Sequence, residues 1–261
     1  MAQKPNKLTS YATQYISEVF ENRLREEGFV CPDDNLLCWY RARNRELINS
    51  LIFSTKFSRL PSYLDIVYGI HPFFIKPVYN RRAYENKIID PVRYRRQSIR
   101  GMIPNSFSGY CPFTSSAYPD RGFSTLENIV LPTMNRIQTI EDCYAWHKEY
   151  IYGIRNDTGG KPQQPDMDYL GHSWMDLLIY VDDKEMYPLQ REAVNTKRER
   201  YMWKNIYDPQ NMKDADEYLH WLRIESAMFG GNRARYLNFL EERKKENIAY
   251  LQKKLGVSIP E

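Results

Sequence analysis

The sequence has little of what membrane spans, secretion signals and disulfide scaffolds require. It holds no apolar run as long as a transmembrane helix, and its first twenty residues lack the apolar core of a secretion signal. Its four cysteines, Cys31, Cys38, Cys111 and Cys143, have neither the paired spacing nor the density of a disulfide framework. We therefore expect a cytoplasmic protein with reduced thiols and no membrane partner.

Motifs for common enzyme chemistries are also scarce. The Thr-Gly-Gly-Lys run at 158–161 is followed by Pro162, where a phosphate-binding loop needs Ser or Thr and the start of a helix. Cys143 and His147 are four residues apart on a predicted helix and could face one ion, but the chain offers no second close-spaced pair of ligands. No Gly-x-Ser-x-Gly nucleophile motif occurs. We expect no cofactor and no metal site, and the scarcity of these motifs favours a non-enzymatic protein without excluding an enzyme.

What is present predicts a folded core that begins with a β-meander. Hydrophobic residues make up 42% of the chain and aromatic residues 14%, which excludes a disordered protein. Apolar and polar positions alternate with a period of two over residues 36–43, 48–55 and 63–70, typical of antiparallel strands with one buried face. The connections at 44–46 and 58–62 are short enough to be hairpin loops.

Helical spacing dominates the rest of the chain. The first helix is predicted over 8–27, with Gly28 as its terminator, and another starts at Ser124, with an apolar run that stops at Pro132. Further helices are predicted over 139–150, 174–181, from Pro188 onward, 213–229 and 233–255. In the last of these, Leu237, Leu240, Ile248, Leu251 and Leu255 form a stripe that packs on the chain's own core or, as the alternative, on another subunit.

These patterns predict an α+β fold: an antiparallel sheet of about four strands, the fourth at Gln97–Ile103, with helices packed on one face and a helical C-terminal region. The polar, Gly- and Pro-rich stretch 155–168 is predicted to be a linker. It separates an α+β domain, 1–154, from the helical region, 169–261. The break at 230–232 favours an antiparallel helical hairpin between the last two long helices.

The strongest functional signal is a stretch rich in arginine and tyrosine. The net charge is +4, yet residues 1–150 carry an excess of five positive charges, all of it within residues 79–100. Guanidinium groups bind phosphates and tyrosine rings stack on bases, so the segment predicts either a nucleic-acid contact or a solvated edge that pairs with acidic groups. The candidate binding residues are Arg81, Arg82, Arg93, Tyr94, Arg95 and Arg96.

The order of several motifs also suggests a family. A helix ends in Arg-Glu-Glu-Gly-Phe at 25–29, and the strand motifs Trp-Tyr-Arg (39–41), Ile-Asn-Ser-Leu-Ile-Phe (48–53) and Leu-Asp-Ile-Val-Tyr-Gly-Ile (64–70) follow. Leu126–Pro132 and the Ile-Gln-Thr-Ile-Glu-Asp run at 137–142 come later. Over about residues 10–150 this resembles the bacterial domain-of-unknown-function family 4304. The resemblance implies an antiparallel α+β domain and supplies no catalytic residues; the segment 79–100 and the tail after 168 depart from it.

Three functions remain open at this point. The leading hypothesis is a non-enzymatic module of immunity or regulatory type that binds another protein, because catalytic motifs are scarce and two surfaces depart from the family pattern. The first alternative is nucleic-acid binding through residues 79–100. The second is an enzyme with a cleft near Arg41, Asp65 and His71, which requires these three side chains to converge on one concave surface.

Overall fold

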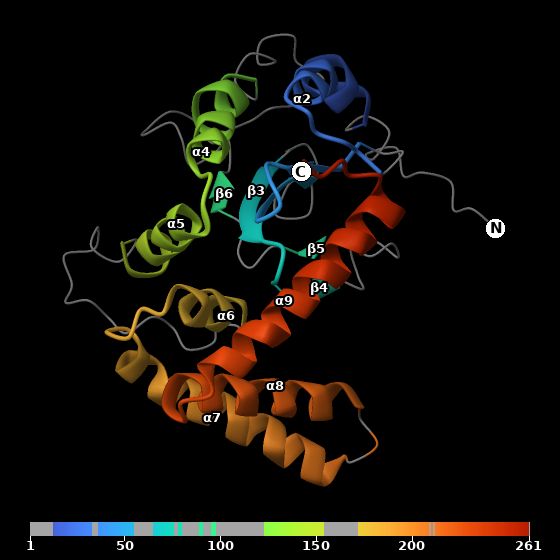
Figure 1. The fold of residues 1–261 in the computed structure, drawn as a ribbon. Coiled ribbons are helices and arrows are strands. Elements are labelled where there is room, and N and C mark those ends of the chain that lie inside the picture. The colour runs from blue at the N-terminus through green and yellow to red at the C-terminus, as the bar shows by residue number, and fades with distance from the viewer. Residues whose placement is uncertain are drawn as a thin grey trace, which may run out of the picture. The chain divides into compact units, whose positions relative to one another are not determined.

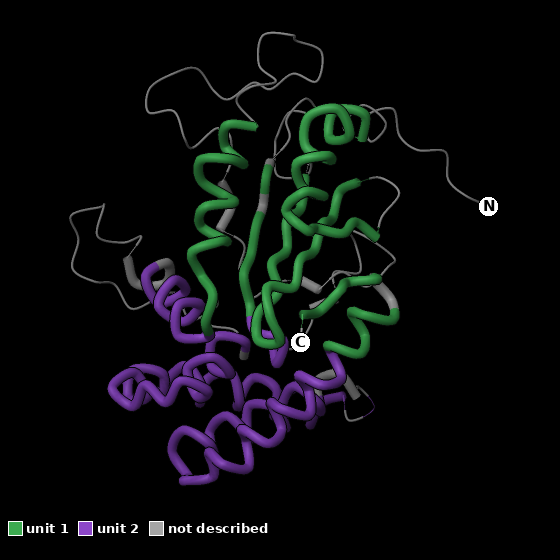
Figure 2. The backbone as a smooth tube through the Cα atoms, turned by 45° about the horizontal axis from the view of Figure 1, so that its top comes forward, with its two compact units in different colours: residues 1–71, 77–139, 248–261 green, residues 72–76, 140–247 purple. Residues whose placement is uncertain are grey.

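The fold is that of a computed structural model of the 261-residue chain. The structure describes residues 13–32, 36–54, 65–75, 78–79, 89–90, 95–97, 123–153, 172–208, 210 and 212–260. The chain forms two compact units, coloured separately in Figure 2. Unit 1 comprises residues 1–71, 77–139 and 248–261, and unit 2 comprises residues 72–76 and 140–247.

Among the described residues, unit 1 contains the strands and three helical segments. The strands are β1 (Cys38–Ala42), β2 (Leu47–Ser54), β3 (Asp65–Pro72), β4 (Val78–Tyr79), β5 (Ile89–Asp90) and β6 (Arg95–Gln97). The helical segments are η1 (Ser17–Glu21) with α2 (Asn22–Glu26), η3 (Leu126–Val130) with α4 (Leu131–Arg136), and the C-terminal turn η6 (Leu251–Leu255). One sheet has the order β1-β2-β3-β6, and β4 pairs with β5 (Figure 1).

The first hairpin of the predicted meander is confirmed. β1 and β2 are antiparallel, with Trp39 opposite Leu51 and Arg41 opposite Asn49. The turn between them depends on Asn44, whose Oδ1 accepts hydrogen bonds from the backbone N–H groups of Glu46 and Leu47 at 2.8 and 2.9 Å. An asparagine side chain that binds the backbone two or three residues on stabilises a tight turn. The second predicted connection, 58–62, lies outside the described residues.

The expectation that these strands bury only one face is wrong for β1 and β2. Trp39 and Arg41 lie on one face and Cys38 and Tyr40 on the other, and all four are buried. On the first face, the Phe53 ring lies 4.9 Å from that of Phe20. The polar positions of β1 and β2 are Tyr, Ser, Asn and one Arg. Arg41 is paired and the tyrosine ring is largely apolar, so the alternation of polar and apolar residues did not mark a solvated face.

The first two helical segments of unit 1 largely follow the sequence pattern. The chain is helical over residues 13–26, and Gly28 then takes a φ of +80°, a backbone conformation that residues with a Cβ rarely adopt. The second segment does not stop at Pro132. Residues 123–136 are continuously helical: a π-helical segment, η3, gives way to α4 at Leu131, and Pro132 lies at this junction.

Unit 2 is mostly helical, as predicted. Its helices are α5 (Ile140–Gly153), α6 (His172–Val181), α7 (Tyr187–Tyr207), α8 (Met212–Phe229) and α9 (Arg233–Tyr250), the last of which runs on into η6 (Figure 1). Pro188 lies in the first turn of α7, as the sequence indicates. The break between α8 and α9 falls at Gly230 and Gly231, of which Gly231 has a φ of +75°. On the predicted stripe of α9 and η6, Leu240 and Leu251 are fully buried.

α8 packs along its length against α7, and the two helices lie side by side in unit 2 (Figure 1). Between α8 and α9 there is instead an open pocket, described below. The two helices and the break predicted within residues 213–255 are present as α8 and α9. The pair of helices that pack side by side is, however, α7 and α8.

The coarse fold class is confirmed: an α+β protein with an antiparallel sheet and a mostly helical C-terminal region. β6 shares only Gln97 with the predicted fourth strand, and residues 98–103 lie outside the described ranges, so that strand stays a prediction. The predicted linker 155–168 lies outside them too, and the compact units have bounds different from those of the predicted domains, since α5 belongs to unit 2. Among the described helices, none is long and apolar enough to cross a membrane.

Candidate functional site

The candidate binding residues of the arginine- and tyrosine-rich segment are mostly outside the described part of the chain. Arg81, Arg82, Arg93 and Tyr94 lie outside it. Arg95 and Arg96 are in β6, where they are opposite Tyr68 and Val67 of β3 in an antiparallel ladder. Nucleic-acid binding through this segment therefore stays a prediction.

The second alternative concerned Arg41, Asp65 and His71. Arg41 is buried, and its guanidinium donates hydrogen bonds to the Glu27 carboxylate at 2.9 Å and to Asn135 Oδ1 at 2.9 Å. Burial, followed by the charge of Arg43, lowers the pKa of Arg41 to about 10, which leaves it charged at neutral pH. Asp65 and His71 are both in β3, and the His71 side chain is buried. Convergence of the three on a cleft stays a prediction.

The potential metal ligands of α5 are both in the interior. Cys143 and His147 are buried, and the His147 ring contacts that of Trp146 edge-on at 4.8 Å. Burial, with a further contribution from the charge of Asp142, raises the pKa of the Cys143 thiol. In the described ranges, no three or more His, Cys, Asp or Glu side chains are grouped as a metal site requires. The Thr-Gly-Gly-Lys run at 158–161 lies outside those ranges.

Unit 2 contains a polar cluster that the sequence did not reveal, centred on Asp176 of α6. Its carboxylate is fully buried and accepts three hydrogen bonds: from Arg243 Nη1 at 2.7 Å, from the Tyr236 hydroxyl at 2.5 Å and from His220 Nε2 at 3.2 Å. Burial alone would raise the pKa of this carboxyl, but the charge of Arg243 and the bonds from His220 and Tyr236 outweigh it, and the pKa is well below its usual range.

The cluster also fixes the tautomer of His220. Arg243 Nη2 lies 3.2 Å from His220 Nδ1, and a guanidinium nitrogen can only donate a hydrogen bond. Nδ1 is therefore the acceptor, and the proton of the neutral ring resides on Nε2, which faces Asp176. Both ring nitrogens are thus engaged inside the cluster, so His220 is not available as a general base to a ligand.

The cluster's chemistry favours stability over catalysis. Asp176, His220, Tyr236 and Arg243 come from α6, α8 and α9, and Arg243 also donates to the Phe74 carbonyl, so the network connects four parts of unit 2. Burial, with a further contribution from Asp176, raises the pKa of the Tyr236 hydroxyl well above its usual value. A charge network whose members satisfy one another stabilises a particular packing arrangement of helices.

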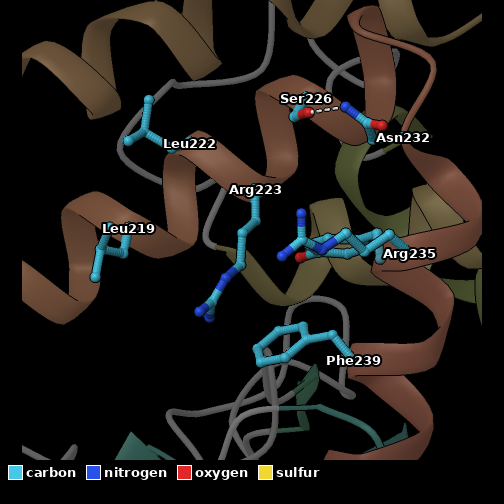
Figure 3. Close-up of a pocket in the computed structure, with 8 residues that line it drawn as sticks. Leu219, Leu222, Arg223, Ser226, Asn232, Arg235 and Phe239 are labelled. Carbon is cyan, nitrogen blue, oxygen red and sulfur yellow. Dashed lines mark hydrogen bonds between the residues drawn. The ribbon is translucent and has the colours of Figure 1, made fainter.

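A pocket of about 420 Å³ opens beside this cluster, between α8 and α9. Figure 3 shows the side chains that line it: Leu219, Leu222, Arg223, Ser226, Asn232, Arg235, Tyr236 and Phe239. Arg223 extends from α8 and Arg235 from α9 into the space between the helices. Tyr236 connects pocket and cluster, since the residue lines the one and its hydroxyl belongs to the other.

Unit 2 also exposes large apolar side chains at the C-terminal end of α7. Trp203 is 52% exposed, Ile206 57% and Tyr207 82%, and the Trp203 and Tyr207 rings stack with centroids 6.2 Å apart. Positions 203, 206 and 207 follow the three- and four-residue spacing of one helix face. We refer to these three residues as the α7 aromatic face. Arg200 and Lys204 are exposed on the same part of the helix.

Sequence reasoning missed each of these features, although two of them left a signal. Asp176 is the single charged residue of the apolar helix α6, and a carboxylate in such a helix requires a buried partner. Trp203 and Tyr207 are aromatic residues in a helix otherwise rich in charge. The pocket has no such signal, because its lining comes from two helices and depends on the angle between them. Comparison with known proteins found no matching family model, no similar curated protein and no similar solved structure.

Proposed function

We propose that this chain is a non-enzymatic binding protein that recognises another protein through the α7 aromatic face. The observation that carries the proposal is the exposure of Trp203, Ile206 and Tyr207 on one face of one helix. Tryptophan and tyrosine are the residue types most often found at the energetic centre of protein interfaces, because they bury a large area at a small entropy cost. Grouped exposure of such side chains is uncommon without a partner.

The charges around this face indicate what the partner presents. Arg200 and Lys204 are on the same side of α7 as Trp203 and Tyr207, and Lys204 Nζ lies 5.1 Å from the centre of the Tyr201 ring. An apolar patch beside two basic groups is complementary to an apolar surface bordered by carboxylates. The proposed partner is therefore a protein with an exposed apolar patch flanked by Asp or Glu.

The buried cluster supports this function indirectly. A binding surface on a helix is effective when the helix is held in a fixed position, because ordering costs then do not reduce affinity. α7 packs along α8, and Arg198 of α7 bonds both oxygens of the Glu225 carboxylate of α8 at 2.9 and 2.8 Å. His220 joins α8 to the cluster centred on Asp176.

The finer expectations on fold and family belong to the same proposal. In that proposal the chain belongs, over about residues 10–150, to the domain-of-unknown-function family 4304. Its sheet has four strands covered by helices on one face, and the protein is cytoplasmic. The helices of unit 1 support the fold part: Arg41, on one face of β1, bonds both to Glu27, next to α2, and to Asn135 of α4.

The test is capture of the partner at a defined position. A tagged chain with a photo-crosslinking amino acid in place of Tyr207 is exposed to a nuclease-treated extract of the source organism in mild salt. The same amino acid in place of Leu189, an apolar residue 64% exposed near the start of α7, is the control. We expect one stoichiometric protein to crosslink from position 207 and not from 189.

Variants then decide whether the α7 aromatic face binds that protein. The double variant Trp203→Ala, Tyr207→Ala should lose the complex, whereas Leu189→Ala should keep it, and higher salt should slow association because the border is charged. Equal crosslinking from both positions, or a complex that survives the double variant, contradicts the proposal. So does the absence of any stoichiometric partner.

A further inference from the structure

We propose that the pocket between α8 and α9 is a second, separate binding site that takes a small organic anion: a carboxylate or phosphate group held by Arg223 and Arg235, on an apolar body. The volume of about 420 Å³ lies in the range of small-molecule sites, roughly 300–1,000 Å³. The lining divides into an apolar part, formed by Leu219, Leu222 and Phe239, and a polar part with two arginines.

Among the described residues, the two pocket arginines differ from Arg198, Arg233 and Arg243 in having no acidic partner. Arg198 pairs with Glu225 at 2.8 Å, Arg233 with Asp182 at 3.3 Å and Arg243 with Asp176 at 2.7 Å. Within the described ranges, Arg223 and Arg235 lie within ion-pair distance of no carboxylate. Guanidinium groups bind carboxylate and phosphate oxygens in a fixed two-pronged geometry, so an anion between them supplies the missing counter-charge.

The interior beside the pocket does not provide that counter-charge. Asp176, the buried carboxylate of the neighbouring cluster, is occupied by Arg243, His220 and Tyr236. The positive charges of Arg223 and Arg243 both act on the Tyr236 hydroxyl, at the boundary between pocket and cluster. The positive charges at the pocket therefore favour a negative group there.

The apolar part of the pocket determines the rest of the ligand. Phe239 presents its ring between two cations, with Arg223 Cζ at 4.7 Å and Arg243 Cζ at 4.4 Å from the ring centre. Leu219, 48% exposed, and Leu222 line the pocket from α8. Near the turn between the helices, Asn232 Nδ2 donates a hydrogen bond to Ser226 Oγ at 2.7 Å (Figure 3). The side-chain oxygen of Asn232, Oδ1, is left as an acceptor. An inorganic ion alone would leave the apolar surface unused.

Calorimetric titration of the full chain with four probes tests the proposal: phenylacetate, phenyl phosphate, benzyl alcohol and inorganic phosphate. We expect at least one aromatic anion to bind, and both the neutral benzyl alcohol and inorganic phosphate to bind at least tenfold more weakly. Comparison of phenylacetate with phenyl phosphate shows which anionic group the arginines prefer. Affinity should fall as salt is added, because the anion replaces solvent ions around two exposed guanidinium groups.

Two variants assign the site. Arg223→Gln and Arg235→Gln should each lower the affinity for the aromatic anion at least tenfold. The matched charge removal Lys245→Gln, on the exposed side of α9, should change that affinity by less than twofold. Circular dichroism confirms that each variant is folded. Absence of binding by both aromatic anions in the millimolar range, equal binding of inorganic phosphate, or affinity unchanged in both arginine variants overturns the proposal.

Discussion

Asp176 and Arg243 form a buried ion pair across 67 positions of sequence, with Nη1 and Oδ2 2.7 Å apart and the Asp176 side chain fully enclosed. Each charge is stable in the interior only because the other is present, since an isolated buried ion costs several kcal/mol, of order 20 by the ideal estimate. The pair connects α6 to α9, and through Arg243 to the backbone of Phe74. The stability of unit 2 therefore depends on it.

The first prediction concerns the removal of one partner. Arg243→Met should lower the free energy of unfolding by about 3–5 kcal/mol, because it leaves the Asp176 carboxylate buried without a counter-charge. Lys245→Met removes a cation from an exposed pair with Glu242 and should change it by less than about 1 kcal/mol. Urea denaturation followed by circular dichroism measures both. Equal effects of the two substitutions would show that Arg243 does not compensate Asp176.

The second prediction is an acid-dependent loss of stability that requires Asp176. The folded-state pKa of this carboxyl lies below its ordinary value of 3.8, so the folded state binds fewer protons than the unfolded state between the two pKa values. Its contribution is present above the unfolded pKa and disappears as the pH falls through the folded one. We expect the stability difference between wild type and Asp176→Asn to be constant near neutral pH and to shrink below about pH 4.

The measurement is the urea midpoint of both proteins over a series of pH values. Other carboxylates with lowered pKa values, Glu27 and Asp183, remain in both proteins and serve as an internal reference for the general acid response. A stability difference that stays constant down to strongly acidic pH would contradict a charged Asp176 in the folded state.

The third prediction concerns the geometry of Arg41 in unit 1. Its Nη1 donates to both the Glu27 backbone carbonyl at 3.1 Å and the Glu27 carboxylate, and its Nη2 donates to Asn135. Lysine retains the charge but cannot reach three acceptors in this fork, so Arg41→Lys should cost about 1–3 kcal/mol of unfolding free energy.

Arg43→Lys is the matched control for that substitution. Arg43 is half-buried and, among the described residues, its side chain makes one long bond, to Asn135 at 3.4 Å, so the change should cost less than about 1 kcal/mol. Chemical denaturation gives both values. A loss for Arg43→Lys as large as that for Arg41→Lys would mean that the charge in this region, and not the fork geometry, stabilises unit 1.

The fourth prediction concerns thiol reactivity. Cys143 is fully buried with a raised pKa, so at neutral pH it has almost no reactive thiolate and no access to a reagent. Cys31 is half-exposed. Iodoacetamide, followed by peptide mass spectrometry, should label Cys31 in native buffer, and Cys143 only once urea unfolds the chain. Labelling of Cys143 at the rate of Cys31 in native buffer would show that α5 opens readily.

Local sequence patterns predicted the elements of this fold well where the signal lies within a few residues. The alternation at 36–43, 48–55 and 63–70 corresponds to β1, β2 and β3, and the helices predicted at 139–150, 213–229 and 233–255 correspond to α5, α8 and α9 with η6. Pro132 misled the prediction because a proline ends a helix in most positions, whereas here the helical stretch 123–136 continues through it, at the junction of η3 and α4.

By itself, the sequence determined the order and type of these elements, because the spacing of apolar side chains and the backbone limits of glycine and proline act over short distances. Only the tertiary structure decided which residues meet. Asp176 bonds to residues 44, 60 and 67 positions away, and the pocket takes one wall from α8 and the other from α9. Such contacts depend on how helices cross, which is set by packing of the whole unit and leaves no periodic trace in the chain.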